Sequence, residues 1–181
     1  MTTATARPSA RRRGGETVLT AIVASPIGPL TLTAVDGRLT GLLMADQAHG
    51  TRDRSGWVED PDALAGVTRQ LQAYFAGERA AFDVALDLRG TPFQQGVWAE
   101  LLRIPFGQTR SYGQVAAAVG SPRASRAVGQ ATGRNPVAVI VPCHRVVGAG
   151  GSLTGFGGGL ARKSWLLAHE RRDGMLPLPP G

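Results

Sequence analysis

Hydrophobic residues near the start of the chain alternate with polar ones or form short runs that turn residues interrupt. Such stretches cover residues 17–24, 30–35 and 39–44, and the turn sequences SPIGP (25–29) and DG (36–37) separate them. Period-two alternation between short turns predicts a small antiparallel meander. Residues 46–60 are mostly polar and contain glycines, which predicts a loop.

A helical period follows. The pattern begins at Asp62 and ends at Gly77, and its apolar positions are Leu64, Val67, Leu71, Tyr74 and Phe75. This spacing predicts one amphipathic helix. Residues 82–88 then alternate strictly, which predicts a further strand returning to the sheet, and residues 89–90 are the expected boundary between two halves of the chain.

The second half opens with helix-start signals. TPFQ (91–94) combines an N-cap Thr, a Pro at the first helical position and a Gln at the third, and the expected inner face carries Phe93, Val97, Leu101 and Ile104. SYGQ (111–114) is a second capping box and predicts a short helix that runs to Val119. GSP (120–122) ends this helix, and the pattern of residues 123–133 predicts another one. Two short helices joined by a tight turn form a helix-turn-helix, although a hairpin packed inside an enzyme fits the same pattern.

In the remaining sequence, a cysteine lies between a predicted strand and a glycine-rich loop. Residues 137–141 are apolar and mostly β-branched, which predicts a buried strand that ends at Pro142, directly before Cys143. Residues 148–159 form a glycine-rich loop that can approach a ligand with bare backbone. Residues 160–171 predict a final helix, and residues 173–181 a flexible tail.

Charge narrows the class of partner. Lys and Arg number 20 against 13 acidic residues, which gives a net charge of +7 and a pI near 11.1. This favours a polyanion, although solubility alone also accounts for it. Residues 1–15 hold part of the excess among Pro, Gly, Ser and Thr, which predicts a disordered basic arm with nonspecific phosphate affinity. No apolar run suits a signal peptide or a membrane span, so we expect a cytoplasmic protein that does not enter a membrane.

Cys143 is the single cysteine, so it serves either packing or chemistry. In PCHR (142–145) the thiol has a potential base next to it and a cation two residues on, which favours a nucleophile. Adjacent residues of an extended chain point to opposite faces, so His144 needs a turn or a bridging water to act on Cys143. Glu170 is the best candidate for the carboxylate that orients His144, and a solvated helix residue is the alternative.

The second helix of the predicted pair favours nucleic acid. It is both cationic and slim, which allows close approach to a groove, because it combines Arg123, Arg126 and Arg134 with the small residues Ala124, Ala127, Gly129 and Ala131. Tyr112 begins the preceding helix, whose free N–H groups suit a phosphate.

These motifs together resemble a known family. PCHRV (142–146), RAVG (126–129), NP (135–136), GFGGG (155–159) and WLL (165–167) are similar in order and spacing to those of the 6-O-methylguanine-DNA methyltransferases. The resemblance is close over residues 91–170 and loose in the first half. It implies an α+β fold, with an N-terminal ribonuclease-like α/β domain (16–89) and a mainly helical C-terminal domain (90–172) that bears the helix-turn-helix and the active-site strand.

The resemblance also implies the chemistry and its residues. Cys143 would accept the alkyl group, His144 would act as base through water, Glu170 would orient it, and Asn135 would fix the loop that carries the cysteine. The thioether product is not readily hydrolysed, so one molecule would repair one 6-O-alkylguanine. 4-O-alkylthymine in DNA is a further candidate substrate.

The implied partner is double-stranded DNA, docked through the minor groove, with the damaged nucleotide flipped out. Arg126 would fill the gap in the base stack and Tyr112 would help rotate the base. The groups expected at the DNA are Gly113, Ser121 and Ala127 beside these two, and those expected at the base pocket are the main chain of Cys143, Val146 and Gly157 together with Phe156.

The chain departs from the family in two ways. Phe156 stands where a tyrosine is common, so alkyl-group preference can differ. The zinc ligands of some relatives have no counterpart in the first half, so we expect no metal and no cofactor. We expect a monomer and leave cooperativity on DNA open. The alternatives are a damage sensor without chemistry, which the cysteine opposes; a transcriptional regulator, which needs more cysteines; and a Cys-His hydrolase of small substrates, which the helix-turn-helix disfavours.

Overall fold

The computed structural model describes residues 16–45 and 54–171, and its elements confirm the expected α+β fold. The basic arm (1–15), the tail (173–181) and part of the predicted loop (46–53) lie outside the described residues. Within the described ranges, no helix has the length and apolar character needed to cross a membrane.

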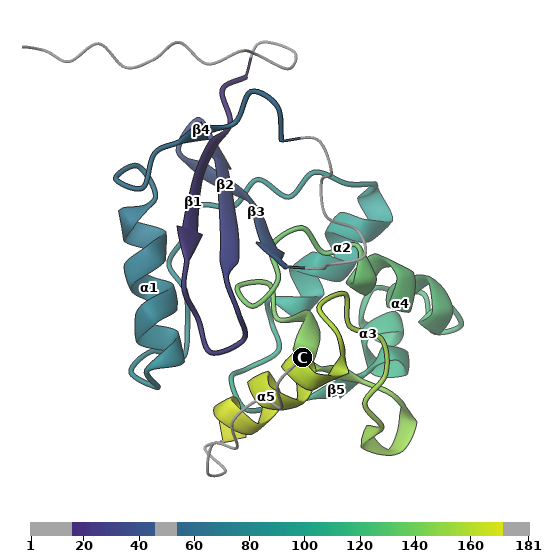
Figure 1. Cartoon of the computed structure of the whole chain (residues 1–181). Coiled ribbons are helices and arrows are strands. Elements are labelled where there is room, and N and C mark those ends of the chain that lie inside the picture. Colours follow the sequence, from purple (N-terminus) through teal and green to yellow (C-terminus); the bar gives the residue numbers. More distant parts are fainter. Residues whose placement is uncertain (1–15, 46–53, 172–181) are drawn as a thin grey trace, which may run out of the picture.

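A four-stranded sheet forms the first half (Figure 1). The predicted meander is confirmed: β1 (Leu19–Val23), β2 (Leu30–Val35) and β3 (Arg38–Met44) pair antiparallel in sequence order. The fourth strand, β4 (Val58–Glu59), pairs parallel with β1 and corrects the prediction that all of residues 46–60 form a loop. Its pairing uses main-chain bonds such as Val58 N to Val18 O at 2.9 Å, which leave no apolar periodicity in the sequence.

The predicted helix of the first half is confirmed as α1 (Ala65–Phe75). Gly77 follows it with a φ of 77°, a conformation that glycine adopts without strain. In Figure 1, α1 flanks the sheet on one side, while α2, α3 and α4 lie on the other.

The predicted strand over residues 82–88 is wrong. That segment makes only one bridge, between Leu39 and Leu86, in which Leu39 N donates to Ala85 O at 2.8 Å. The edge of β3 is shared: a few residues farther on, Leu42 N donates to Pro136 O at 2.9 Å. Residues 82–88 therefore have no room to pair along the whole strand.

The helix starts of the second half follow their capping boxes. Thr91 and Ser111 cap α2 (Pro92–Leu101) and α3 (Tyr112–Ala118), and in each box the Gln at the third position bonds back to the cap backbone. α4 (Ser125–Gly133) begins later than residue 123, because a turn from Ser121 O to Ala124 N comes first. α5 (Leu160–Arg171) is as predicted, and β5 (Arg110–Ser111) pairs parallel with β6 (Val146–Val147).

One hydrophobic core runs through both halves. It joins side chains of the sheet, α1, α2, α4 and α5, among them Leu32, Leu42, Leu71, Val97, Trp98, Val128 and Leu166. Polar bonds cross the same boundary: Arg162 on α5 donates to Ile27 O at 2.8 Å and to Ala45 O at 3.1 Å. The first half of the chain therefore directly contacts α5, the helix that carries Glu170.

Candidate active site and DNA-binding surface

The segment before Cys143 is a buried turn, so the predicted strand over residues 137–141 is wrong. Val139 has a φ of 71°, and Ile140 N and Val141 N donate back to Ala138 O and Val137 O, each at 2.9 Å. A left-handed conformation costs a β-branched residue about 1–3 kcal/mol, and it persists only where the surroundings impose it. Here the contacts of Asn135 and of the β3 edge hold Val139 in this conformation, and the turn determines the position of Cys143.

Asn135 holds this turn from inside. Its Nδ2 donates to Val141 O at 2.8 Å and its Oδ1 accepts from Val137 N at 3.0 Å, and the side chain is buried. One amide thus satisfies two main-chain groups at the two ends of the turn, a role close to the one that the resemblance implies.

Cys143 begins a 3-10 turn, Cys143–Arg145, and its side chain is only 4% exposed. Cys143 lies in the hydrophobic core, because Pro142 and the bond from Cys143 N to Val141 O (2.8 Å) turn the chain inward. The tight turn that His144 needs to lie near Cys143 is present.

Glu170 is buried and collects hydrogen bonds from three segments, so the alternative of a solvated helix residue is wrong. Its Oε1 lies 2.8 Å from His144 Nε2, and Arg145 binds both carboxylate oxygens at 2.8 Å. Tyr74 Oη donates to Oε1 at 2.9 Å and Gly107 N to Oε2 at 3.1 Å. This carboxylate fixes the position of His144.

The same contacts determine the tautomer of His144. Burial would raise the pKa of Glu170, but the hydrogen bonds from His144 and Arg145 outweigh it and hold that pKa well below its ordinary value. An ionised carboxylate only accepts, so Nε2 of a neutral His144 carries the proton. Nδ1, buried and without a hydrogen-bond partner among the described residues, is then the free base.

The pKa shifts fix the resting protonation states of the thiol and the imidazole. Burial raises the pKa of the Cys143 thiol above its ordinary value, and a hydrogen bond with Asn135 and the charge of Lys163 offset only part of that rise. Burial also lowers the pKa of His144, despite its bond to Glu170, so the imidazole is neutral at pH 7. The resting site therefore holds a protonated thiol and a neutral base.

Lys163 is a functional candidate that the sequence argument missed. Its side chain is fully buried in α5, and its Nζ donates to Val146 O at 2.5 Å and to Thr154 O at 2.6 Å. Burial lowers its pKa, and the negative charge of a Cys143 thiolate would raise it. The signal was present in the spacing: Lys163 lies three, four and seven residues before Leu166, Leu167 and Glu170, all on the buried face of the helix.

The glycine-rich loop is bonded to the start of α3. Tyr112 Oη donates to Thr154 O at 3.1 Å and to Gly155 O at 3.2 Å, and the tyrosine is half-buried. Val146 is fully buried under the loop, whereas Phe156 and Gly157 are partly exposed. Lys163 joins this loop to Val146, because its Nζ donates to the carbonyl oxygens of both Val146 and Thr154.

A separate group of predicted residues lies on the outer surface. Gly113, Arg126 and Ala127 are exposed, and Ser121 is partly exposed. A cavity of about 630 Å³ lies between α4 and the glycine-rich loop, lined by Tyr112, Ser125, Arg126, Gly129, Gln130, Gly133, Arg134, Thr154 and Gly155. Tyr112 thus belongs both to this cavity and to the loop over the cysteine. Ser121 N donates to Ala116 O at 2.9 Å, so only its hydroxyl stays available to a phosphate.

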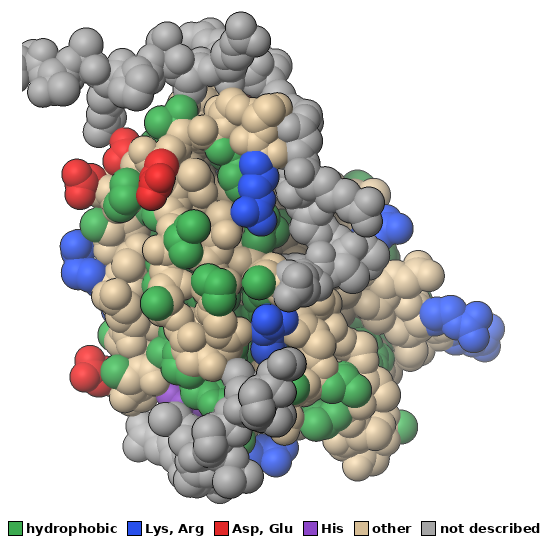
Figure 2. Space-filling view, in the orientation of Figure 1, with side chains coloured by type: hydrophobic (Ala, Val, Ile, Leu, Met, Phe, Trp, Pro, Cys, Tyr) green, Lys and Arg blue, Asp and Glu red, His purple; other side chains and the backbone are tan. Residues whose placement is uncertain are grey.

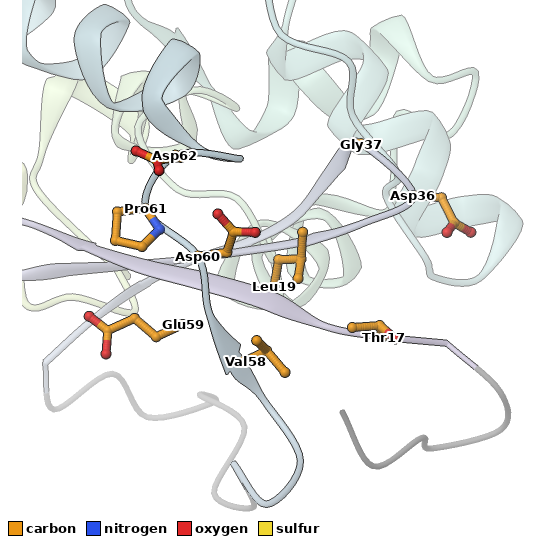
Figure 3. Close-up of a pocket in the computed structure, with 9 residues that line it drawn as sticks. All are labelled: Thr17, Leu19, Asp36, Gly37, Val58, Glu59, Asp60, Pro61 and Asp62. Carbon is orange, nitrogen blue, oxygen red and sulfur yellow. The ribbon is translucent and has the colours of Figure 1, made fainter. Parts of the chain in front are cut away.

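The face drawn in Figure 2 carries most of its acidic side chains near the β4 end of the sheet. Basic side chains are spread more widely over this face, and some project near α4. The acidic end contains a cavity of about 560 Å³, lined in part by Asp36, Glu59, Asp60 and Asp62. The carboxylates of Asp36, Glu59 and Asp62 point away from one another (Figure 3), and no group of three or more His, Cys, Asp or Glu among the described residues could hold a metal ion. Its charge makes this end a poor surface for DNA.

Comparison with known proteins identifies the family. Residues 18–88 match the ribonuclease-like domain of 6-O-methylguanine DNA methyltransferase, and residues 92–172 match its DNA binding domain. The chain belongs to the 6-O-methylguanine DNA methyltransferase family. The methylated-DNA–protein-cysteine methyltransferase of Mycolicibacterium paratuberculosis is 59% identical over 150 residues, which span 83% of this chain and 90% of that protein.

A more distant relative and a solved structure support the same family assignment. The methylated-DNA–protein-cysteine methyltransferase of Methanosarcina acetivorans is 49% identical over 153 residues, spanning 83% of this chain and 96% of that protein. The crystal structure of Mycobacterium tuberculosis OGT in complex with DNA matches with a TM-score of 0.83 and 54% identity, covering 89% of this chain and 98% of that one. The predictions of the family, of a DNA-repair methyltransferase and of DNA as partner are confirmed.

Proposed function

We propose that the chain removes the alkyl group from 6-O-alkylguanine in double-stranded DNA and keeps it on the sulfur of Cys143. The observation that carries this proposal is the buried His144–Glu170 pair, at 2.8 Å, beside the single cysteine of the chain. A cysteine with only a packing role has no need of a neutral base held by a carboxylate.

The chemical step begins with proton transfer. The Cys143 thiol loses its proton through a water to Nδ1 of His144, whose other nitrogen stays bonded to Glu170. The charge of Glu170 stabilises the imidazolium, and Lys163 stabilises the thiolate. Neither charge has to be created by rearranging the site, since both are already fixed by hydrogen bonds.

The thiolate then attacks the alkyl carbon. An S–C bond forms, the C–O bond breaks, and its electron pair passes to the 6-oxygen of guanine. The guanine then takes up one proton on a ring nitrogen, so that overall the proton of the Cys143 thiol replaces the alkyl group. The thioether has no proton to lose and no good leaving group, so we propose a single turnover for each molecule.

Access to the lesion requires the nucleotide to leave the duplex. We propose that α4 docks in the minor groove with Ala127 against the sugar-phosphate edge, that Arg126 occupies the gap in the base stack, and that Tyr112 guides the base toward the loop at residues 154–157. Gly113 and the Ser121 hydroxyl would bind flanking phosphates. The exposure of Arg126 and the cavity that joins it to Tyr112 support this path.

The finer points of substrate and assembly are also proposals. Phe156, partly exposed in the glycine-rich loop, has no hydroxyl, so alkyl groups would be distinguished by size rather than by a polar contact, and 4-O-alkylthymine is a further candidate substrate. We propose a cytoplasmic monomer with two domains, residues 16–89 and 90–172, and a site built from Cys143, His144, Glu170 and Asn135 without a cofactor.

The test is intact-protein and peptide mass spectrometry after incubation with a duplex that carries one 6-O-methylguanine. We expect one methyl group on the peptide that contains Cys143, in proportion to the lesion supplied, and none on a Cys143→Ala control that still binds the duplex. Binding of the lesion with an unmodified wild-type protein would make the chain a damage sensor and would overturn the proposal.

A further inference from the structure

One hydroxyl connects the ribonuclease-like half of the chain to the carboxylate of the active site. Tyr74 lies on α1, within the residues that match the ribonuclease-like domain, whereas Glu170 lies within those that match the DNA binding domain. The side chain of Tyr74 is fully buried, and its Oη donates to Glu170 Oε1 at 2.9 Å.

The acceptor oxygen is the one that serves His144. Oε1 lies 2.8 Å from His144 Nε2 and accepts from Arg145 at 2.8 Å, while Oε2 accepts from Arg145 and Gly107. Burial, followed by the nearby charge of Glu170, raises the pKa of Tyr74 well above its ordinary value, so the phenol stays a donor at every working pH. Tyr74 and His144 therefore share the negative charge of one oxygen atom.

Packing fixes the direction of that hydroxyl. The ring of Tyr74 contacts the rings of Phe75, Phe82 and His169 at centroid distances of 5.2, 5.3 and 5.2 Å. At the other end of the residue, its carbonyl oxygen lies 2.8 Å from His169 Nε2. A tyrosine held at both ends cannot turn its hydroxyl away from Glu170 without displacing its neighbours.

We propose that Tyr74 is a positioning residue for alkyl transfer: its hydroxyl fixes Glu170 Oε1 and limits how strongly that oxygen attracts a proton on His144. The ribonuclease-like half thereby contributes to the chemical step as well as to the fold. This inference rests on the proposed function, because it assumes that His144 accepts the thiol proton.

The sign of the effect follows from the shared oxygen. Without the hydroxyl, Oε1 offers more negative charge to His144, the protonated imidazole is stabilised, and its pKa rises. The other charged and titratable groups around the pair, namely Arg145, Lys163, His169 and Cys143, are unchanged by this substitution. Alkyl transfer needs a neutral His144, so the acid limb of its pH profile should move to higher pH.

The experiment measures single-turnover methyl transfer from the lesion duplex between pH 5 and 8.5 for the wild type and Tyr74→Phe. We expect the acid limb to rise by about half a unit, while the plateau rate near pH 8 rises by no more than about threefold, because the substitution also stabilises the imidazolium that the step forms. Phe75→Leu is the matched control: it disturbs the same aromatic cluster and keeps the hydroxyl, so it should lower the melting temperature without moving the limb.

A second variant keeps the shape of the residue. 3-Fluorotyrosine at position 74, introduced site-specifically, is a more acidic and stronger donor, and it should move the acid limb to lower pH. An unmoved limb in both Tyr74 variants, or an equal shift in Phe75→Leu, would overturn the inference. Failure of the proposed function would look different, since the wild type itself would then leave Cys143 unmethylated.

Discussion

Replacing the buried carboxylate by its amide, Glu170→Gln, tests the centre of the site. The carboxylate accepts bonds from His144, Arg145, Tyr74 and Gly107, and the amide has only one oxygen to offer them. Its NH2 group must face a donor, and the positive charge of Arg145 loses its buried partner. The substitution changes few atoms, so its effects report charge and hydrogen bonding rather than volume.

The expected loss has two parts. Removing one member of a buried ion pair costs about 3–5 kcal/mol, which for a chain of this length lowers the melting temperature by roughly 6–20 °C. A hydrogen bond to a charged group contributes about 1.5–3 kcal/mol, so the imidazolium formed on His144 loses enough stabilisation to slow methyl transfer roughly tenfold to a hundredfold. Differential scanning fluorimetry and single-turnover transfer at 20 °C measure the two parts separately.

Glu100→Gln provides the matched control. Glu100 is also buried and paired, with Arg103 at 3.1 Å and Arg110 at 2.7 Å, but it lies on α2 and outside the network of Cys143. We expect a lower melting temperature and an unchanged rate. If Glu100→Gln slows transfer as much as Glu170→Gln, or if Glu170→Gln transfers at the wild-type rate, the assignment of Glu170 is refuted.

Three further predictions follow from the same contacts. Lys163→Met removes the ammonium that lowers the pKa of Cys143, so single-turnover transfer at pH 7 should slow by about tenfold, and wild-type speed would exclude this electrostatic role. The folded-state pKa values of His144 and Glu170 lie below their ordinary values, so the stability that these groups contribute is complete above about pH 6.5 and is lost as the pH falls. The urea concentration at the midpoint of unfolding should therefore decline from pH 7 to pH 4, and a midpoint that stays constant would contradict this. Arg126→Ala should slow transfer from a well-paired lesion roughly tenfold and from a mismatched lesion much less, and equal losses on both duplexes would show that Arg126 only binds phosphate.

Local chemistry made the helices of the second half predictable. The boxes at Thr91 and Ser111 place helix starts through bonds between residues three apart, so no distant part of the fold can alter them. Cys143, His144 and Glu170 were also accessible to the sequence argument, because Cys143 and His144 are adjacent and a carboxylate usually completes a Cys-His pair.

Failures arose where distant contacts override local preference. Val139 is a β-branched residue in a left-handed conformation, which no local rule favours, and the bonds of Asn135 on either side of it explain why it is retained. The hydroxyl of Tyr74 gave no signal either, since a tyrosine on the apolar face of a helix needs no polar partner to explain it. Only the tertiary structure shows that its partner is Glu170.

The burial of Cys143 would protect a protein for which we propose a single turnover. A thiol that is 4% exposed, and whose pKa burial raises, is a poor target for small oxidants and electrophiles, which react with exposed thiolates. Unspent molecules can therefore persist among reactive metabolites without being consumed. Under the proposed function, selectivity would come from binding: a substrate would reach the sulfur only after it is bound across α4 and its flipped base is brought to the turn at Pro142.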